Sequence, residues 1–327
     1  PPTGFVALQQ DNLPETAKGV SGLVWMKNRD STDNHQLYDS SRGRQKDLHS
    51  NTTGAESTTT DGLQKFLKGG QQIEDDVSIN TSGESYVSWN WVANGGTTAS
   101  NSNGSISSTV QANTTAGFSI VQWTGDGGQS TVGHGLSSTP KIVIQKRLNS
   151  ASDWWFYTTA VDGSYDYGKL NTSDTFSAQS AGSAPTSTTF TSHGWGGSDN
   201  MVAYVFHEVE GYSKLSSYTG NGSSDGAFVY TGFKPSFLMI KCTTHANNWV
   251  MYNNKMNPFN PVGVNLGTLF PNRTNAAETQ GGIDFCANGF KARSTYENFN
   301  GSGRTYVYMA FAEHPFVGDG TNPVTAR

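Results

Sequence analysis

One pattern occurs three times in this amino-acid sequence, and it constrains the fold more than any other feature. In each copy a short apolar run ends in lysine, and a tyrosine in an aromatic or apolar cluster follows eleven residues later. The three lysines are Lys27, Lys146 and Lys241, and the three tyrosines are Tyr38, Tyr157 and Tyr252. Each copy closes on a further strand-like run, at residues 86–91, 201–207 and 306–311. A copied unit predicts an array of similar modules, and such an array requires no active site.

The second and third copies align best, since 95 residues separate Lys146 from Lys241. Both open with a strand followed by a Gly-rich turn, at residues 125–127 and 220–222, whereas the first copy lacks this opening and begins directly at Val20. The expected organisation is a connecting segment at 1–17, an incomplete first repeat at 18–93, an exposed linker or long loop at 94–116, a second repeat at 117–212, a third at 213–317 and a tail at 318–327. The linker is assigned because residues 94–116 are nearly all Asn, Ser, Gly and Thr.

The composition indicates an all-β protein. Aromatic residues make up 12% of the chain, which supplies apolar surface for cores, while glycine together with Ser, Thr and Asn supplies turns. Helix-forming residues do not accumulate at helical spacing over more than about two turns. Modules of about 95 residues with several short strands suit a two-sheet β-sandwich or jelly roll.

Charge and hydropathy exclude several classes of partner. The net charge is −5 with only 21 Lys and Arg, so the basic stripe that nucleic acid requires is missing. No run approaches 18 apolar residues, and the residues after Pro1 do not have the pattern of a signal peptide, so we expect no membrane insertion. The two cysteines, Cys242 and Cys286, are no disulfide framework; buried thiols are favoured over a pair.

Clustered aromatic residues are the strongest candidates for a binding site. Neighbours in a strand face opposite ways, so Trp154 and Trp155 cannot both fill one core, and one of them should be exposed. The candidate residues, which either stack on a glycan or pack between modules or subunits, are Trp154, Trp155, Tyr157, Trp249 and Tyr252. Packing is the favoured role. The first copy has His35-Gln36-Leu37-Tyr38 where the second has Trp-Trp-Phe-Tyr, which argues against three equal sugar sites.

Metal and catalytic signals are weak. Asp126 and Asp225 lie in Gly-rich turns, where carboxylate and carbonyl oxygens could hold calcium, but neither has the spacing of a known calcium loop. No cofactor is predicted beyond that calcium. Glu208 and Glu210 lie two apart and so share one strand face, which is a poor arrangement for flanking a glycosidic bond. No nucleophile elbow and no phosphate loop occurs.

Several segments resemble known viral proteins. Residues 1–8 with Asn12-Leu13-Pro14 resemble the segment that follows a SPRY-like domain in tail-associated structural proteins of marine tailed phages. Residues 22–29, 37–43 and 306–313 resemble a repeated lectin-like, concanavalin- or LamG-like, β-sandwich module of the same proteins. The resemblance implies a virion component without catalytic residues, and a chain that begins inside a longer protein.

Three functions follow as hypotheses. The first is a non-enzymatic virion structural protein, either a tail fibre or adhesin that contacts the host surface or a capsid-surface fibre or decoration protein. Its expected partners are itself, with a trimer favoured, other virion proteins and a host surface glycan. The second is a lectin-like array of carbohydrate-binding modules. The third, a polysaccharide depolymerase, ranks last because duplicated modules with divergent acidic residues offer no shared site.

Overall fold

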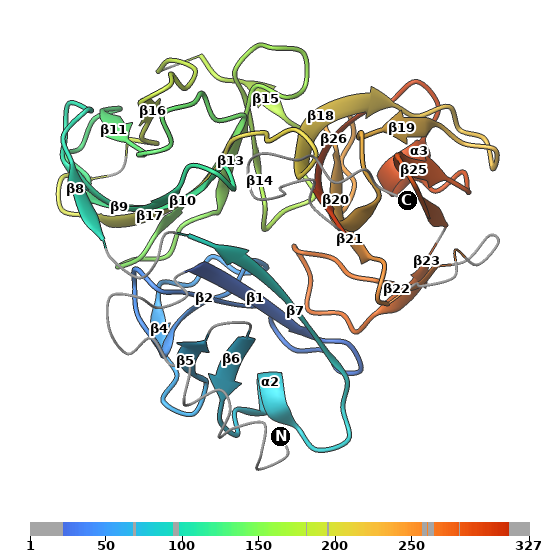
Figure 1. Ribbon diagram of the computed structural model, residues 1–327, viewed down its shortest axis with the longest axis horizontal. Coiled ribbons are helices and arrows are strands. Elements are labelled where there is room, and N and C mark those ends of the chain that lie inside the picture. The colour runs from blue at the N-terminus through green and yellow to red at the C-terminus, as the bar shows by residue number, and fades with distance from the viewer. Residues whose placement is uncertain are drawn as a thin grey trace. The chain divides into compact units, whose positions relative to one another are not determined.

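The computed structural model describes residues 22–67, 70–93, 98–180, 182–194, 196–256, 260, 265–280 and 282–313 (Figure 1). Short antiparallel strands dominate throughout, and the two described helices, α2 (Val77–Asn80) and α3 (Glu297–Asn300), have four residues each. The predicted all-β class is confirmed. Neither of these helices has the length or the apolar character to cross a membrane.

The first repeat forms a five-stranded sheet. Its strand order is β4-β3-β2-β1-β7, with β1 (Gly22–Asn28), β2 (Gln36–Asp39), β3 (Lys46–Leu48), β4 (Ser57–Thr58) and β7 (Tyr86–Val92). A hairpin of β5 (Leu63–Leu67) and β6 (Gly70–Ile73) supplies a second layer. Apolar side chains of β1 and β2 pack against Leu63 of the hairpin and Ile79 of α2, which forms the core of this repeat.

The second repeat is built on three adjacent strands, β10 (Phe118–Thr124), β17 (Asn200–Phe206) and β12 (Ile142–Arg147). A hairpin of β8 (Ala99–Asn101) and β9 (Ser108–Asn113) extends the sheet beyond β10. The smaller layer consists of β11 (Thr131–Gly133) and β16 (Thr189–Thr191). Trp123 of β10 meets Phe190 of β16 edge to face, with ring centroids 5.4 Å apart.

The third repeat is a two-layer sandwich. One layer has the order β18-β26-β20-β21, from β18 (Ser213–Thr219), β26 (Thr305–Ala312), β20 (Pro235–Cys242) and β21 (Val250–Asn253). The other has the order β19-β25-β24, from β19 (Phe228–Tyr230), β25 (Gly289–Ala292) and β24 (Ile283–Cys286), and β22 (Asn265–Thr268) pairs with β23 (Glu278–Gln280). Side chains from both layers form one core, in which Tyr218 meets Phe290 with ring centroids 5.6 Å apart.

The sheet register shows that the three repeats share one plan. The lysine of each repeat lies opposite a valine of the closing strand, and the pairs are Lys27–Val87, Lys146–Val202 and Lys241–Val307. The Trp123–Phe190 and Tyr218–Phe290 contacts occupy equivalent positions of the second and third repeats. Among the described strands, β7 pairs only with β1, and the residues before Gly22 lie outside the described part of the chain.

The expected linker at 94–116 is wrong over most of its length. β8 and β9 lie within it, and β9 pairs with β10 from Phe118↔Asn113 to Trp123↔Ser108. Small polar residues form a ladder here because the sheet hydrogen bonds join backbone groups, and β9 finds backbone partners on both edges, in β10 and β8. The predicted segments 1–17 and 318–327 lie outside the described residues.

Two compact units, and not three, make up the chain. Unit 1 comprises residues 1–155 and 180–207, and unit 2 comprises residues 156–179 and 208–327. The second repeat is therefore divided, because its segment 156–179, with β13 (Trp155–Thr158), β14 (Asp166–Lys169) and β15 (Ser177–Ala178), groups with the third repeat. The contacts described below explain this grouping.

Candidate functional site

Within unit 1, the second repeat is fastened to the first through Trp154 and Lys146. The indole Nε1 of Trp154 donates to the carbonyl oxygen of His49 at 2.8 Å, and the ring stacks on Tyr204. Lys146 Nζ donates to the carbonyl oxygen of Thr53 at 3.0 Å and to that of Ser152 at 2.6 Å. Both donors are completely buried, so each hydrogen bond is made away from water.

Within unit 2, the third repeat is fastened to residues 156–179 in the same way. Trp249 Nε1 donates to the carbonyl oxygen of Lys169 at 2.9 Å, and Lys241 Nζ donates to that of Ser173 at 3.3 Å. The Trp249 ring also packs on Phe156 and Phe176, with ring centroids 4.8 and 6.0 Å away. The acceptors lie four residues apart in both units, which indicates equivalent loops.

The first repeat keeps the lysine but not the tryptophan. His35 stands eight residues after Lys27, as Trp154 and Trp249 stand after their lysines, and it accepts a hydrogen bond from Trp25 Nε1 at 2.9 Å. Lys27 Nζ donates within its own repeat, to the carbonyl oxygens of Asn28 and Ser31. Burial lowers the pKa of Lys27, Lys146 and Lys241 to about 8 in each case.

Four of the five predicted binding aromatics are at most 1% exposed, namely Trp154, Tyr157, Trp249 and Tyr252. A glycan cannot stack on side chains that protein atoms cover, so that role is wrong for these four. The alternative of packing between repeats fits both tryptophans, while Tyr157 and Tyr252 pack on the aromatic rings of Tyr165 and Phe299. Trp155 is only half-buried and stacks on His193, as expected for the outward-facing member of its pair.

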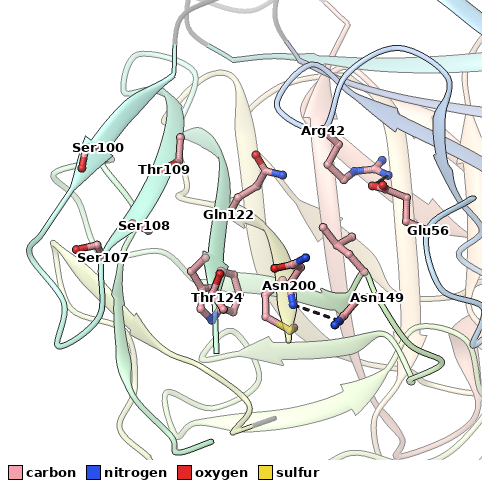
Figure 2. Close-up of a pocket in the computed structure, with 13 residues that line it drawn as sticks. Arg42, Glu56, Ser100, Ser107, Ser108, Thr109, Gln122, Thr124, Asn149 and Asn200 are labelled. Atoms are coloured by element: carbon pink, nitrogen blue, oxygen red, sulfur yellow. Dashed lines mark hydrogen bonds and ion pairs between the residues drawn. The ribbon is translucent and has the colours of Figure 1, made fainter. Parts of the chain in front are cut away.

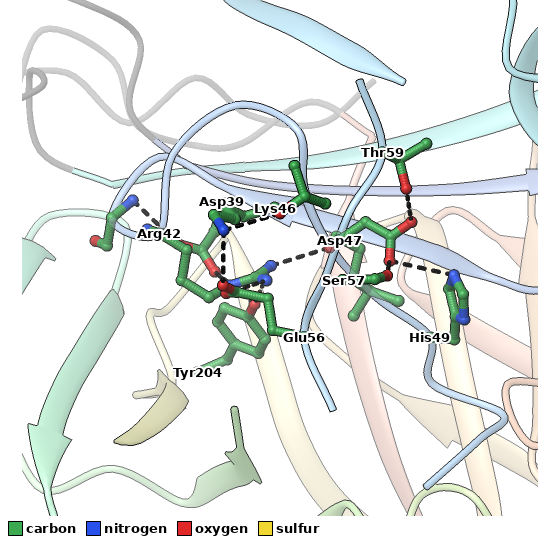
Figure 3. A network of polar contacts seen from close by, with 12 residues as sticks. Asp39, Arg42, Lys46, Asp47, His49, Glu56, Ser57, Thr59 and Tyr204 are labelled. Carbon is green, nitrogen blue, oxygen red and sulfur yellow. Dashed lines mark hydrogen bonds and ion pairs between the residues drawn. The ribbon is translucent and has the colours of Figure 1, made fainter. Parts of the chain in front are cut away.

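A charged network that the sequence analysis missed lies at the junction in unit 1 (Figure 3). The Arg42 guanidinium pairs with the Asp39 carboxylate and, at 3.2 Å, with Glu56, and Tyr204 Oη donates to Asp39 at 2.7 Å. The Arg42 and Asp39 side chains are at most 1% exposed. Burial lowers the pKa of Arg42, but Asp39, Tyr204 and Glu56 together outweigh burial and raise the pKa. The sequence feature that could have revealed this pair is the Asp-x-x-Arg spacing, because it places both charges in one turn.

A second cluster surrounds Asp47. Its carboxylate accepts hydrogen bonds from Ser57 and Thr59, both at 2.8 Å, and lies 3.2 Å from His49 Nε2 (Figure 3). Burial alone would raise the pKa of Asp47, yet the three partners lower it. This cluster fixes the loop whose His49 carbonyl receives Trp154, so it positions the junction.

A polar groove of about 660 Å³ lies in unit 1 (Figure 2). The sheet register places five of its side chains on one face, namely Ser100, Thr109, Gln122, Thr124 and Asn200. Arg42 and Glu56 border it and are paired with each other. Among its lining residues Glu56 is the only carboxylate, whereas glycoside hydrolysis uses two. The groove therefore suits a neutral ligand with hydroxyl or amide groups.

The predicted calcium ligands are engaged in protein contacts. Asp126 closes its own turn by accepting from Gly128 N at 3.1 Å and from Ser130 Oγ at 2.6 Å. Asp225 lies 2.8 Å from Lys291 Nζ and 3.7 Å from Arg293, two cations that oppose calcium binding. No group of three or more His, Cys, Asp or Glu side chains within the described ranges could hold a metal ion. Cys242 and Cys286 form no disulfide, and the favoured expectation of buried thiols is confirmed for Cys242, whereas Cys286 is only half-buried.

Comparison with known proteins identifies one family. No curated protein and no solved structure matches the chain. Residues 11–315 match a domain of unknown function, DUF7483. That range covers the described strands of all three repeats and both junctions. The chain is therefore a member of the DUF7483 family.

Proposed function

We propose that this chain is a non-catalytic structural and adhesive protein of a virus particle, which builds a tail fibre or adhesin and contacts the host surface. The observation that carries the proposal is the junction that occurs once in each unit. The lysine and tryptophan of one repeat donate to the backbone of the preceding segment, so the chemically versatile side chains serve assembly.

The same observation favours a structural role over catalysis. The buried lysines, with a pKa near 8, would be candidates for nucleophiles, but their Nζ atoms are enclosed and bonded to carbonyl oxygens. The groove brings together amides and hydroxyls, and its single carboxylate is paired with arginine. A polysaccharide depolymerase thus has little support.

An adsorption assay tests the proposal. The purified chain is added to host cells before the virus whose genome encodes it, and the fraction of adsorbed particles is measured. An adhesin reduces adsorption in proportion to the cell-bound chain. Immunogold electron microscopy with antibodies against the chain then distinguishes a tail from a capsid-surface position. Absence of label from intact particles would contradict a virion role.

A carbohydrate-binding array is the second candidate, and the neutral groove is the observation that favours it. Gln122, Thr109 and Asn200 present amide and hydroxyl groups of the kind that bond sugar hydroxyls. Binding of the chain to glycans without any effect on adsorption, and without label on particles, would favour this candidate.

A further inference from the structure

Two large aromatic side chains of unit 2 are exposed side by side on β19. Phe228 is 47% and Tyr230 64% exposed, whereas Val229 between them is 7% exposed and belongs to the core. Alternate residues of a strand share a face and lie about 7 Å apart. Packing therefore accounts for Val229 but leaves both rings directed away from the core.

The neighbouring strand leaves room for these rings. In the ladder between β19 and β25, Tyr230 lies opposite Gly289 and Phe228 lies opposite Lys291. A Cβ atom on Gly289 would be 3.1 Å from Phe228 Cζ, so the phenyl ring extends toward the glycine. The result is an aromatic platform, by which we mean Phe228, Tyr230 and the bare backbone of Gly289.

Charged hydrogen-bonding groups border the aromatic platform. Lys291 Nζ lies 2.8 Å from the Asp225 carboxylate, which is 82% exposed. Arg293 lies 3.7 Å from the same carboxylate, and its Nε lies 3.3 Å from Asp284. A ligand above the rings would find donors and acceptors at one side.

The second repeat shows that the fold does not need these aromatics. β11 and β16 have the same register, with Val132 opposite Phe190 as Val229 is opposite Phe290. Thr131 and Gly133 stand where the third repeat has Phe228 and Tyr230. There the strand is also covered, because Ser105 N donates to Thr131 Oγ1 and Ile106 forms a bridge with Val132. The exposed rings thus distinguish the third repeat from the second.

We propose that Phe228 and Tyr230 form a stacking site for the pyranose rings of a cell-surface glycan, with Asp225, Lys291 and Arg293 bonding its hydroxyl groups; this inference rests on the adhesive function proposed above. Apolar C–H faces of sugar rings pack on aromatic rings, and charged or amide groups satisfy the hydroxyls at the rim. A second copy of the chain fits less well, because a stable interface buries about 800 Å² per partner and two half-exposed rings offer about 200 Å².

Affinity electrophoresis tests this site. The purified chain is run in native gels that contain dextran, laminarin, xylan, alginate or bacterial lipopolysaccharide, and retardation gives the dissociation constant. The variant combines Phe228→Thr with Tyr230→Thr, which removes both rings and keeps residues that are common in strands. We expect its affinity to fall about tenfold to a hundredfold, because each aromatic contact contributes modestly. Tyr230→Phe, which retains the ring, should bind nearly as the wild type does.

Val77→Thr is the matched control, because it removes another exposed apolar side chain, and it should bind like the wild type. Gln122→Ala tests the polar groove as the rival site for the glycan. Circular dichroism checks that all variants are folded. Loss of binding in Gln122→Ala, with the double variant unaffected, would place the glycan in the groove and overturn the proposal.

The two proposals fail in different ways. A wild-type chain that blocks virus adsorption but is retarded by none of the five polysaccharides would refute the glycan site and leave the adhesive function intact. A chain whose retardation depends on Phe228 and Tyr230, but which does not affect adsorption, would support the site and refute the adhesin.

Discussion

The junctions of unit 1 and unit 2 share their donors and differ in what surrounds them. In unit 1 the Trp154 ring stacks on Tyr204, whose hydroxyl bonds to the Asp39–Arg42 pair. In unit 2 the equivalent Trp249 packs on two phenylalanine rings. The acceptors are backbone carbonyls in both, and every residue has one, so the accepting loops diverged in sequence while the junction persisted. The surroundings vary because either apolar rings or a satisfied ion pair can exclude water.

The largest expected loss of stability follows from removal of Trp249 from its junction in unit 2. Trp249→Ala should lower the free energy of unfolding by about 4 kcal/mol, since it leaves a cavity between Phe156 and Phe176 and removes the hydrogen bond to the Lys169 carbonyl oxygen. Urea unfolding followed by far-ultraviolet circular dichroism measures the loss. Trp155→Ala, at a half-buried neighbour, is the control and should cost much less. A loss below about 1 kcal/mol for Trp249→Ala would show that the junction in unit 2 contributes little.

Loss of the buried Asp39–Arg42 ion pair in unit 1 should lower the free energy of unfolding nearly as much. Arg42→Met leaves Asp39 buried without its cation and should cost about 3 kcal/mol. Arg293→Met removes an arginine from a more exposed ion-pair cluster and should change stability by less than about 1 kcal/mol. Thermal melts of both variants give the comparison. Equal losses would mean that burial of the Asp39–Arg42 pair does not distinguish the two sites.

The three buried lysines, Lys27, Lys146 and Lys241, predict an unusual dependence of the free energy of unfolding on pH. Their pKa of about 8 lies below the ordinary 10.5, so the unfolded chain binds more protons than the folded chain between these values. The free energy of unfolding should therefore rise from pH 7 to pH 9, by about 1 kcal/mol for each lysine. Urea midpoints at a series of pH values measure the rise, and Lys146→Met should reduce it.

Above pH 10 the buried tyrosines should make the free energy of unfolding fall as the pH rises. Burial raises the pKa of Tyr204 and Tyr218 well above 10, so the unfolded chain loses these phenolic protons first. Stability should then fall steeply, which places the maximum near pH 9 to 10. A maximum at or below pH 7 would contradict the lysine contribution.

The smallest effects are expected at the two predicted calcium ligands. Asp126→Ala should cost about 0.5–1 kcal/mol, because it removes the hydrogen bonds that close one turn. EDTA should leave the melting temperature of the wild-type chain unchanged. A chelator-induced drop that Asp225→Asn abolishes would restore calcium to that turn in unit 2.

Local sequence signals predicted the strands and the repeats but not their partners. The lysine-to-tyrosine spacing reflects register within one sheet, which adjacent strands determine, and the all-β class followed from aromatic, β-branched and turn residues. The linker prediction failed because Ser-rich composition does not report whether a neighbouring strand offers a free edge. Phe228 and Tyr230 escaped notice because an exposed and a buried aromatic look alike in a sequence.

Apolar periodicity and turn chemistry act over a few residues, so the amino-acid sequence is enough to predict a repeated all-β array with a small negative net charge. The hydrogen bond from Trp154 to the His49 carbonyl oxygen spans 105 residues and the one from Tyr204 to Asp39 spans 165, so both arise only when the chain folds. Folding also settles which aromatic side chains are buried in junctions and which remain at the surface. These outcomes depend on how distant strands meet, and no local pattern encodes that.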